Sequence, residues 1–230
     1  DKAVLTGSAE TGKAVMQDLA EALTPSTMEL SGCDAAFIRS GADVTQVARA
    51  LTFGLTFNGS ATCIAPRRVF CAYKLAEPLV KQLIDNLREV EPILVDPKTA
   101  SKVQELIDEA VQSGATLACG EVDLDNHTVR PVVLSDASPA MRVMQEDTFA
   151  PILAVTACRD ASEALADAAL CPYALGATVF GPEEQARRLA RKVKAGVVVV
   201  NDMIVPTADP RMPFGGRGAS GFGVTRGAEG

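Results

Sequence analysis

One cysteine of the chain stands where a thiol could attack a carbonyl. The stretch FNGSATC ends at Cys63, just before a strongly apolar run, and residues 59–62 offer little bulk to bury the thiol. In such a loop a thiol is able to face a cleft, where backbone N–H groups stabilise a thiolate and later the oxyanion of an attacked carbonyl. The alternative is a buried core thiol, the commonest role of a free cysteine.

A nucleophilic thiol needs a base, and the chain has a single histidine. His127 lies in DLDNHTVRP, a turn-like stretch that favours a surface loop. A carboxylate is the other option. Glu29 stands between Met28 and Leu30 in a strand-like stretch, and apolar neighbours raise the pKa of a carboxylate toward the range of a general base. The alternative for Glu29 is the solvent face of an edge strand.

The composition excludes several classes of protein. The chain has 230 residues, 47% hydrophobic and 22% charged, and a net charge of −7. It lacks the clustered positive charge that nucleic-acid binding needs, and no apolar run approaches the ~20 residues of a membrane span. Six cysteines without CxxC spacing predict free thiols in a reducing, cytoplasmic compartment, and one histidine removes most metal sites. We expect no nucleic acid, membrane or metal.

Strands alternate with helices along the chain, and these elements must position Cys63 and Glu29. Apolar residues at helical spacing predict helices, between strand-like runs, over 42–57, 74–88, 98–112, 161–170 and 182–194. This alternation indicates an α/β fold with a mainly parallel sheet flanked by helices. FNGSATC is then a loop that leaves the first of these helices. The run Val197–Val200 is typical of a central strand covered on both faces.

Five stretches, in order from residue 5 to residue 223, resemble motifs of the NAD(P)-dependent aldehyde dehydrogenase superfamily. TMELSGCDAAFI is similar to its glutamate motif, LELGGK, and FNGSATC to its cysteine motif, FxNxGQxC. The glutamate and the cysteine are 34 positions apart, as is usual in the family. LTGSAETGK resembles FTGSxxxG in the cofactor domain, QEDTFAPILAV the ExFGP motif, and PFGGRGASGFG the PFGGxxxSGxG signature.

The resemblance implies a role for each matched residue of the thiol chemistry. Cys63 is the nucleophile whose thiolate attacks the aldehyde carbonyl, and the adduct collapses by transferring hydride to NAD(P)+. Glu29 activates the water that hydrolyses the resulting thioester. Asn58 occupies the asparagine of the cysteine motif and organises the loop.

The resemblance also implies NAD or NADP as cofactor, without deciding between them. Gly7, Ser8 and Gly12 are expected near the pyrophosphate, at a helix N-terminus whose backbone donors favour anions. Two further residues, Asp147 and Phe149, stand where the family holds the nicotinamide ribose and positions the ring. Asp147 is one methylene shorter than the glutamate of the motif, and the adjacent Glu146 could substitute for it.

Other motif positions depart from the family pattern. Ser60-Ala61 replaces the Gly-Gln before the cysteine, Ser31 the first glycine of the glutamate motif, Cys33 its lysine, and Ala150 the glycine of the phenylalanine motif. Such changes could loosen the positioning of the cofactor. None removes the nucleophile or the base.

Family members are roughly twice as long as this chain, so the resemblance implies half of an enzyme. Residues 1–28 are predicted to be a remnant of the dinucleotide-binding domain, 29–222 the catalytic domain, and 223–230 the start of a return segment. A full-length parent is expected to act on a small-molecule aldehyde, which the sequence does not identify, as a homo-oligomer, whereas this chain alone is expected to turn over none. The alternatives are a CoA-acylating aldehyde dehydrogenase and a catalytically silent module for assembly or partner binding.

Overall fold

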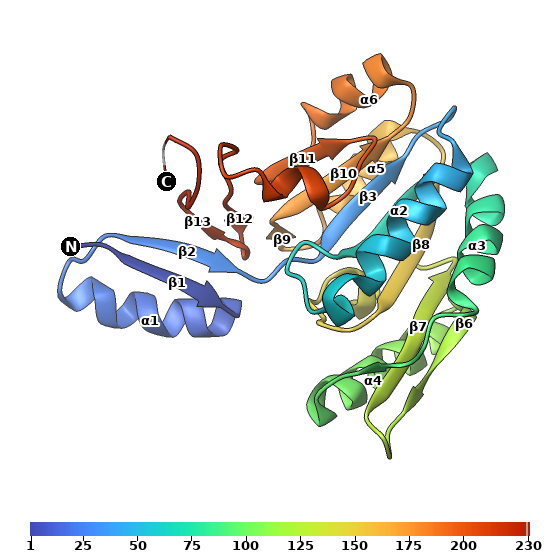
Figure 1. Ribbon diagram of the computed structural model, residues 1–230, viewed down its shortest axis with the longest axis horizontal. Coiled ribbons are helices and arrows are strands. Elements are labelled where there is room, and N and C mark those ends of the chain that lie inside the picture. Colours follow the sequence, from blue (N-terminus) through green and yellow to red (C-terminus); the bar gives the residue numbers. More distant parts are fainter. Residues whose placement is uncertain (229) are drawn as a thin grey trace.

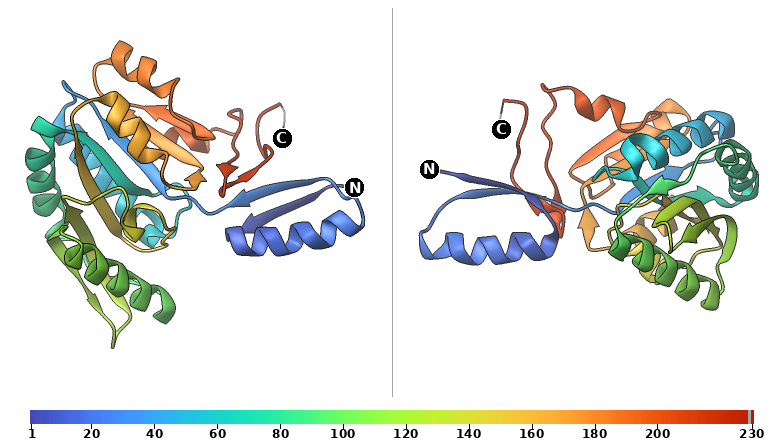
Figure 2. Two further views of the ribbon diagram at one scale, coloured as in Figure 1. Left: turned by 180° about the vertical axis from the view of Figure 1, so that it is seen from behind. Right: turned by 60° about the horizontal axis from the view of Figure 1, so that its bottom comes forward.

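The computed structural model describes residues 1–228 and 230, which form a large sheet, a small sheet and one two-stranded pair (Figure 1). The small sheet contains β1 (Ala3–Gly7) and β2 (Ser26–Leu30), which are parallel and joined by α1 (Ala9–Glu21). β13 (Gly221–Phe222) pairs antiparallel with β2, so the small sheet joins the two ends of the chain. This unit projects from one side of the larger sheet (Figure 2).

The large sheet has eight strands, and its order from one end is β11-β10-β3-β4-β8-β7-β5, with β6 also paired to β7. Every pair from β11 to β7 is parallel, whereas β5 and β6 pair antiparallel with β7. The strands are β3 (Asp34–Ile38), β4 (Pro66–Ala72), β5 (Ile93–Leu94), β6 (Thr116–Asp123), β7 (Thr128–Ser135), β8 (Ile152–Cys158), β10 (Gly176–Phe180) and β11 (Val197–Val200).

Helices cover both faces of this sheet, because the central strands are apolar on both sides. In β3 all five residues are buried, and alternate side chains enter two separate cores. One core is closed by α2 (Val44–Thr56) and α3 (Tyr73–Leu87), through residues such as Leu51 and Leu83. The helices of the other core are α4 (Pro97–Gln112), α5 (Ala161–Ala168) and α6 (Glu183–Ala190).

The predicted α/β fold with a mainly parallel sheet is confirmed, but one strand lies elsewhere than expected. Val197–Val200 forms β11 at the end of the strand order, and its residues are half-buried rather than central. A short apolar run indicates that a strand packs against other elements, but it carries no information about which strands pair with it. The predicted domain limits stay predictions. In the structure β2 extends to Leu30, so the small sheet includes Glu29.

The tail, which reads as loop in the sequence, also contributes pairing. β12 (Arg217–Gly218) pairs with β9 (Tyr173–Ala174), and β13 follows directly. In the described part of the chain, no helix is both long enough and apolar enough to cross a bilayer.

Candidate active site

Glu29 lies in β2, at the junction of the two sheets. Its register partners are Thr6 of β1 and Gly221 of β13. The hydroxyl of Thr225 donates a hydrogen bond to Glu29 Oε1, and Thr225 N–H donates to Phe214 O at 3.0 Å. The carboxylate is therefore held by the C-terminal segment, a contact that nothing in the local sequence around either residue indicates.

Cys63 follows a tight loop that leaves α2, as predicted. The segment η1 (Phe57–Ser60) contains three successive residues with positive φ: Asn58 at 52°, Gly59 at 62° and Ser60 at 63°. Asn58 Nδ2 donates to Ala61 O at 3.2 Å and so closes the loop on itself. The exposed Asn58 side chain thus holds the loop backbone through its amide, and the role expected of it at the site stays a prediction.

The surroundings of the Cys63 sulfur favour the protonated thiol. Burial raises its pKa above 9.0, and the charges of Asp34 and Glu29 raise it further. The backbone N–H groups of Cys63 and Ile64 lower the pKa, but they do not outweigh burial. The stabilising role expected of the loop N–H groups stays a prediction.

Gly32 brings the glutamate and cysteine segments together. A Cβ at position 32 would lie 2.4 Å from the Cys63 carbonyl oxygen and 2.8 Å from Asp34 Oδ1. Contacts this short are excluded for any side chain. Burial raises the pKa of that Asp34 carboxyl to about 7, although the Gly176 N–H donates to it. The single cavity predicted to join the Glu29 carboxylate and the Cys63 sulfur stays a prediction.

Arg67 of β4 ties the cysteine loop to the QEDTFAP loop. Its guanidinium is buried, with Nη1 donating to Ser60 Oγ at 2.7 Å and to Ala150 O at 2.6 Å. Nη2 donates to Ser60 O at 2.7 Å. Burial lowers the pKa of Arg67 to about 10, so it stays charged at neutral pH. Arg67 was not among the predicted site residues, although a pair of arginines at the start of an apolar strand is a signal of buried polar contacts.

The strand–turn–helix at the N-terminus fits a phosphate-binding turn. Ser8 caps α1, with Oγ accepting from Thr11 N at 3.0 Å. Gly12 is buried, and a Cβ there would lie 2.7 Å from two carbons of Leu30, so α1 packs closely on β2. A helix N-terminus at the carboxyl end of a parallel strand presents free amides to an anion. The predicted residues Gly7, Ser8 and Gly12 are therefore adjacent in the expected arrangement.

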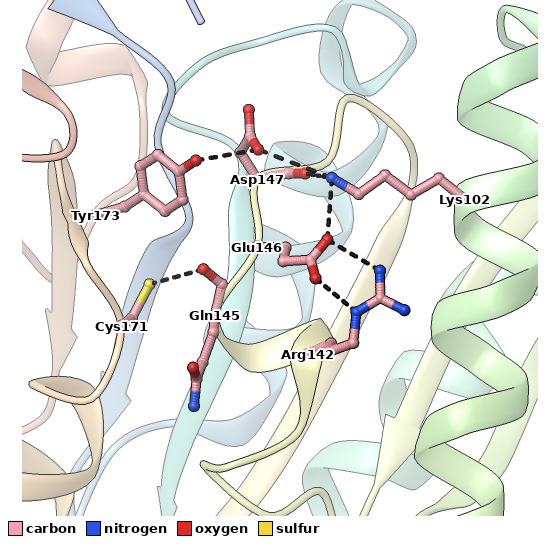
Figure 3. A network of polar contacts seen from close by, with 7 residues as sticks. All are labelled: Lys102, Arg142, Gln145, Glu146, Asp147, Cys171 and Tyr173. Atoms are coloured by element: carbon pink, nitrogen blue, oxygen red, sulfur yellow. Dashed lines mark hydrogen bonds and ion pairs between the residues drawn. The ribbon is translucent and has the colours of Figure 1, made fainter. Parts of the chain in front are cut away.

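The acidic residues of the QEDTFAP loop belong to a charged network (Figure 3). Glu146 Oε1 accepts from Arg142 Nε at 2.6 Å, and this hydrogen bond holds the pKa of Glu146 below its usual value. Lys102 Nζ lies 3.4 Å from Glu146 Oε2 and 3.8 Å from Asp147 Oδ1. Tyr173 donates to Asp147 Oδ1 at 3.2 Å. Because two cations already engage Glu146, it is the less available of the two carboxylates for a ribose.

Phe149 has 41% of its surface exposed, so its ring is accessible to a planar ligand. The residues present thus fit a dinucleotide: a helix N-terminus for phosphate, a carboxylate and an aromatic ring. Within residues 1–228 and 230, no group of three or more His, Cys, Asp or Glu residues is arranged to hold a metal ion.

The fold and the site together define a class: an α/β protein with a thiol and a carboxylate where a nucleotide-binding type of unit meets a larger parallel sheet. Comparison with known proteins gives the family. The model of the aldehyde dehydrogenase family matches residues 1–230. The chain belongs to the aldehyde dehydrogenase family.

Two curated relatives illustrate the match. The chain is 31% identical over 240 residues to a probable coniferyl aldehyde dehydrogenase of Pseudomonas aeruginosa, covering 100% of this chain and 50% of that protein. It is 29% identical over 239 residues to the dimeric NADP-preferring aldehyde dehydrogenase of Rattus norvegicus, covering 99% and 52%. The chain spans about half the length of the curated relatives it matches.

Solved structures agree. Betaine aldehyde dehydrogenase of Staphylococcus aureus in complex with NAD+ is 28% identical, with a TM-score of 0.92, over 100% of this chain and 49% of that one. The NADP-dependent glyceraldehyde-3-phosphate dehydrogenase of Bacillus halodurans, complexed with NADP, is also 28% identical, with a TM-score of 0.91, over 98% and 49%. Structural neighbours of this chain therefore bind NAD or NADP, as the sequence predicted for the cofactor.

Proposed function

We propose that the protein containing this chain oxidises an aldehyde to a carboxylic acid, with Cys63 as nucleophile, Glu29 as base and NAD or NADP as hydride acceptor. The observation that carries the proposal is the environment of the Cys63 sulfur. The segment that follows Glu29 packs against the Cys63 carbonyl oxygen at Gly32, and the backbone N–H groups of Cys63 and Ile64 and the charge of Glu29 act on the pKa of the thiol. Two amide donors at a nucleophile are also suited to the oxyanion that forms next to it.

Because the thiol is protonated at rest, its proton must leave first. Glu29 takes this proton, the sulfur bonds to the carbonyl carbon, and the oxyanion accepts hydrogen bonds from the loop. When bound, the nicotinamide accepts the hydride that leaves this carbon, and a thioester on Cys63 results. Glu29 releases its proton to solvent and then takes one from a water, which attacks the thioester carbon. The acid leaves and the Cys63 sulfur is free again.

Residues around the chemistry have supporting roles. Gly7, Ser8 and Gly12 hold the pyrophosphate at the N-terminus of α1. Asp147 and Phe149 hold the nicotinamide ribose and ring, with Glu146 fixed beside them by its cations. A small-molecule aldehyde as substrate, a homo-oligomer and a cytoplasmic location stay predictions.

The test uses the intact protein that contains this chain, with a panel of aliphatic and aromatic aldehydes and NAD+ or NADP+. We expect steady NAD(P)H formation that Cys63→Ser lowers by about a thousandfold or more and that Glu29→Gln lowers by about a hundredfold. Cys158→Ser, which removes a thiol buried in the sheet, is the matched control and should retain activity. Unchanged activity in Cys63→Ser would refute the proposal.

The 230-residue chain alone is expected to give no steady NAD(P)H, because it spans half the length of its relatives. One observation favours a catalytically silent module instead: the raised pKa of the Cys63 thiol. A silent module would leave the intact protein inactive with every aldehyde and indifferent to Cys63→Ser. A CoA-acylating enzyme would form acyl-CoA without free acid, and the presence of Glu29 argues against it.

A further inference from the structure

A cavity separate from the candidate active site lies between α5 and α6. It has a volume of about 530 Å³, and β3, β4 and β10 contribute to its floor. Both helices cover the same face of the large sheet (Figure 2, left). Residues 192–195, which follow α6, contribute one wall. Among the described residues that line the cavity, none is a candidate catalytic or cofactor-binding residue, so the proposed reaction gives it no role.

Small side chains leave this space open. Half of the residues that line the cavity are alanine or glycine, among them Ala166 and Ala168 of α5 and Ala177 of β10. Alanine favours a helix, but its methyl group is too short to fill the space up to a neighbouring helix. Sites for small organic ligands have volumes of about 300–1,000 Å³. The cavity is therefore large enough to hold one such ligand.

A buried cation lines the floor of the cavity. Arg68 of β4 is 4% exposed, with Nε donating to Cys33 O at 2.7 Å and Nη1 to Ala168 O at 3.1 Å. A guanidinium has five N–H groups, and these contacts use two of them. None of the ion pairs in the described part of the chain includes Arg68, although its charge and that of Asp34 act on each other from a longer distance. A buried charge is costly unless an opposite charge pairs with it, so Arg68 favours an anion in the cavity.

Two further cations and an apolar wall complete the lining. Lys192 and Lys194 line the cavity and are exposed to solvent. Neither belongs to an ion pair among residues 1–228 and 230. Phe37 and Leu165 contribute apolar surface, and no aspartate or glutamate is among the described lining residues. Positive charge beside an apolar wall is suited to an anion that carries an apolar chain.

We propose that this cavity binds a small amphiphilic carboxylate, with its carboxylate on Arg68 and its apolar chain between α5 and α6. Arginine binds a carboxylate through paired N–H groups, and Arg68 has unused N–H groups on Nη1 and Nη2. The charges of Lys192 and Lys194 attract the anion toward the cavity. Carboxylic acids are also the products of the oxidation proposed above, a link that rests on the proposed function, whereas the binding itself does not.

The experiment measures binding to the intact protein that contains this chain, by isothermal titration calorimetry without cofactor. The probe is octanoate. Two matched probes are 1-octanol, which has the same apolar chain without the charge, and inorganic phosphate, which has charge without the chain. We expect octanoate to bind at one site per chain, about tenfold or more tightly than either matched probe. Equal affinities for octanoate and 1-octanol would overturn the proposal, because the cations would then take no part in binding.

Two variants locate the bound octanoate. Arg68→Lys keeps the charge but loses the planar fork of N–H groups, and should weaken octanoate binding by about tenfold. Because Arg68 also holds Cys33 O and Ala168 O, urea denaturation checks that this variant is folded. Ala177→Val narrows the cavity from β10 without altering any cation, and should also weaken binding by about tenfold. The second variant therefore tests the site even where the first is unstable.

A pair of double variants provides the matched control. Lys192→Gln/Lys194→Gln removes the exposed cations of the cavity and should weaken octanoate binding by about threefold or more. Lys74→Gln/Lys81→Gln removes two exposed lysines from α3, on the other face of the sheet, and should change the affinity by less than about twofold.

Two results would overturn the proposal. Unchanged affinity in both Ala177→Val and Lys192→Gln/Lys194→Gln would place octanoate elsewhere on the protein. An absence of octanoate binding would mean that the rest of the intact protein fills or covers the cavity. The titration needs no turnover, so an inactive protein would refute the proposed function without affecting this result.

Discussion

At the scale of single residues, Cys63 lies between two opposing influences. Two amide donors favour its thiolate, while burial and the charges of Asp34 and Glu29 favour the thiol. The carboxylate that we propose as the base thus disfavours the thiolate of the proposed nucleophile while the protein is at rest. Such an arrangement keeps a thiol unreactive until something near it changes, for example the arrival of a cofactor with a cationic ring. Glu29 thus has two proposed effects, since its charge disfavours the thiolate and its carboxylate acts as the base. One substitution tests both.

Glu29→Gln removes the negative charge but retains an oxygen for the Thr225 hydroxyl. Because the charge of Glu29 raises the pKa of Cys63, its removal lowers that pKa and increases the thiolate fraction at any pH below it. We expect alkylation of Cys63 by iodoacetamide at pH 8, without cofactor, to become about threefold faster, although turnover falls. In the unaltered protein the rate should rise with pH to beyond 9. Tryptic peptide 50–67, which holds Cys63 alone, reports the rate.

Cys171 serves as the reference within the same experiment. Its pKa of about 6 means that its alkylation, though limited by burial, should stop rising above pH 7. Its rate should also be the same in Glu29→Gln. Slower alkylation of Cys63 in Glu29→Gln would show that Glu29 removes the thiol proton already in the resting protein, contrary to the repulsion argued above.

At the scale of elements, Arg67 shows how one strand holds two loops. Its three hydrogen bonds satisfy Ser60 and Ala150 inside the protein. Arg67→Met keeps the side-chain volume but removes the donors to the two Ser60 oxygens, whereas Ala150 O still accepts from Ile152 N at 2.8 Å. We expect it to lower the free energy of unfolding by roughly 2–4 kcal/mol, measured by urea denaturation. Cys63 should also lose its pH-dependent alkylation profile as the loop opens.

Two further variants give this experiment its controls. Arg67→Lys restores one donor and should recover part of the stability and of the alkylation profile. Arg187→Met removes an exposed arginine of α6 that pairs with Glu183, and should change stability by less than about 0.5 kcal/mol. Equal losses in Arg67→Met and Arg187→Met would show that the buried contacts of Arg67 do not hold the loops.

The elements also show what sequence alone could supply. Helices such as α3 and α4 repeat apolar residues on one side, and their predicted ranges differ from the observed bounds by a residue. Local patterns could not place β11 at the end of the sheet, because pairing depends on residues far away. For the same reason Arg67 and Thr225 escaped prediction, since their partners are distant in sequence or lie in another loop. Motif spacing suggested Glu29 and Cys63, and Gly32 is the contact through which their segments meet.

At the scale of the whole molecule, the small sheet is held to the large one by two connections. One is the segment from β2 to β3, and the other is the C-terminal segment that returns to β2 through β13. Leu30 N donates to Ser220 O at 3.1 Å beside the β13 pairing. The small sheet and α1, which project from the large sheet in Figure 2, carry the candidate phosphate turn. The position of this turn relative to Cys63 therefore depends on these contacts.

Gly221 is the point where this return is most sensitive. Its φ is +97°, and a Cβ there would lie 1.9 Å from the Met28 carbonyl oxygen. Gly221→Ala therefore forces β13 away from β2, and we expect it to destabilise the protein by about 2 kcal/mol or more. Hydrogen exchange should accelerate in residues 1–30 and stay unchanged in β8, because the eight-stranded sheet does not depend on the return segment.

Gly114→Ala is the control for Gly221→Ala, because it adds backbone strain without a steric clash. Gly114 has a φ of +103° but nothing within 4 Å of the position of a Cβ, so its substitution adds only the strain of a left-handed alanine, about 1 kcal/mol. If the two variants lose equal stability and leave residues 1–30 equally protected, β13 does not hold the small sheet. If Gly221→Ala loses more stability, and loses hydrogen-exchange protection only in residues 1–30, then the C-terminal segment determines the position of the phosphate turn relative to the proposed nucleophile.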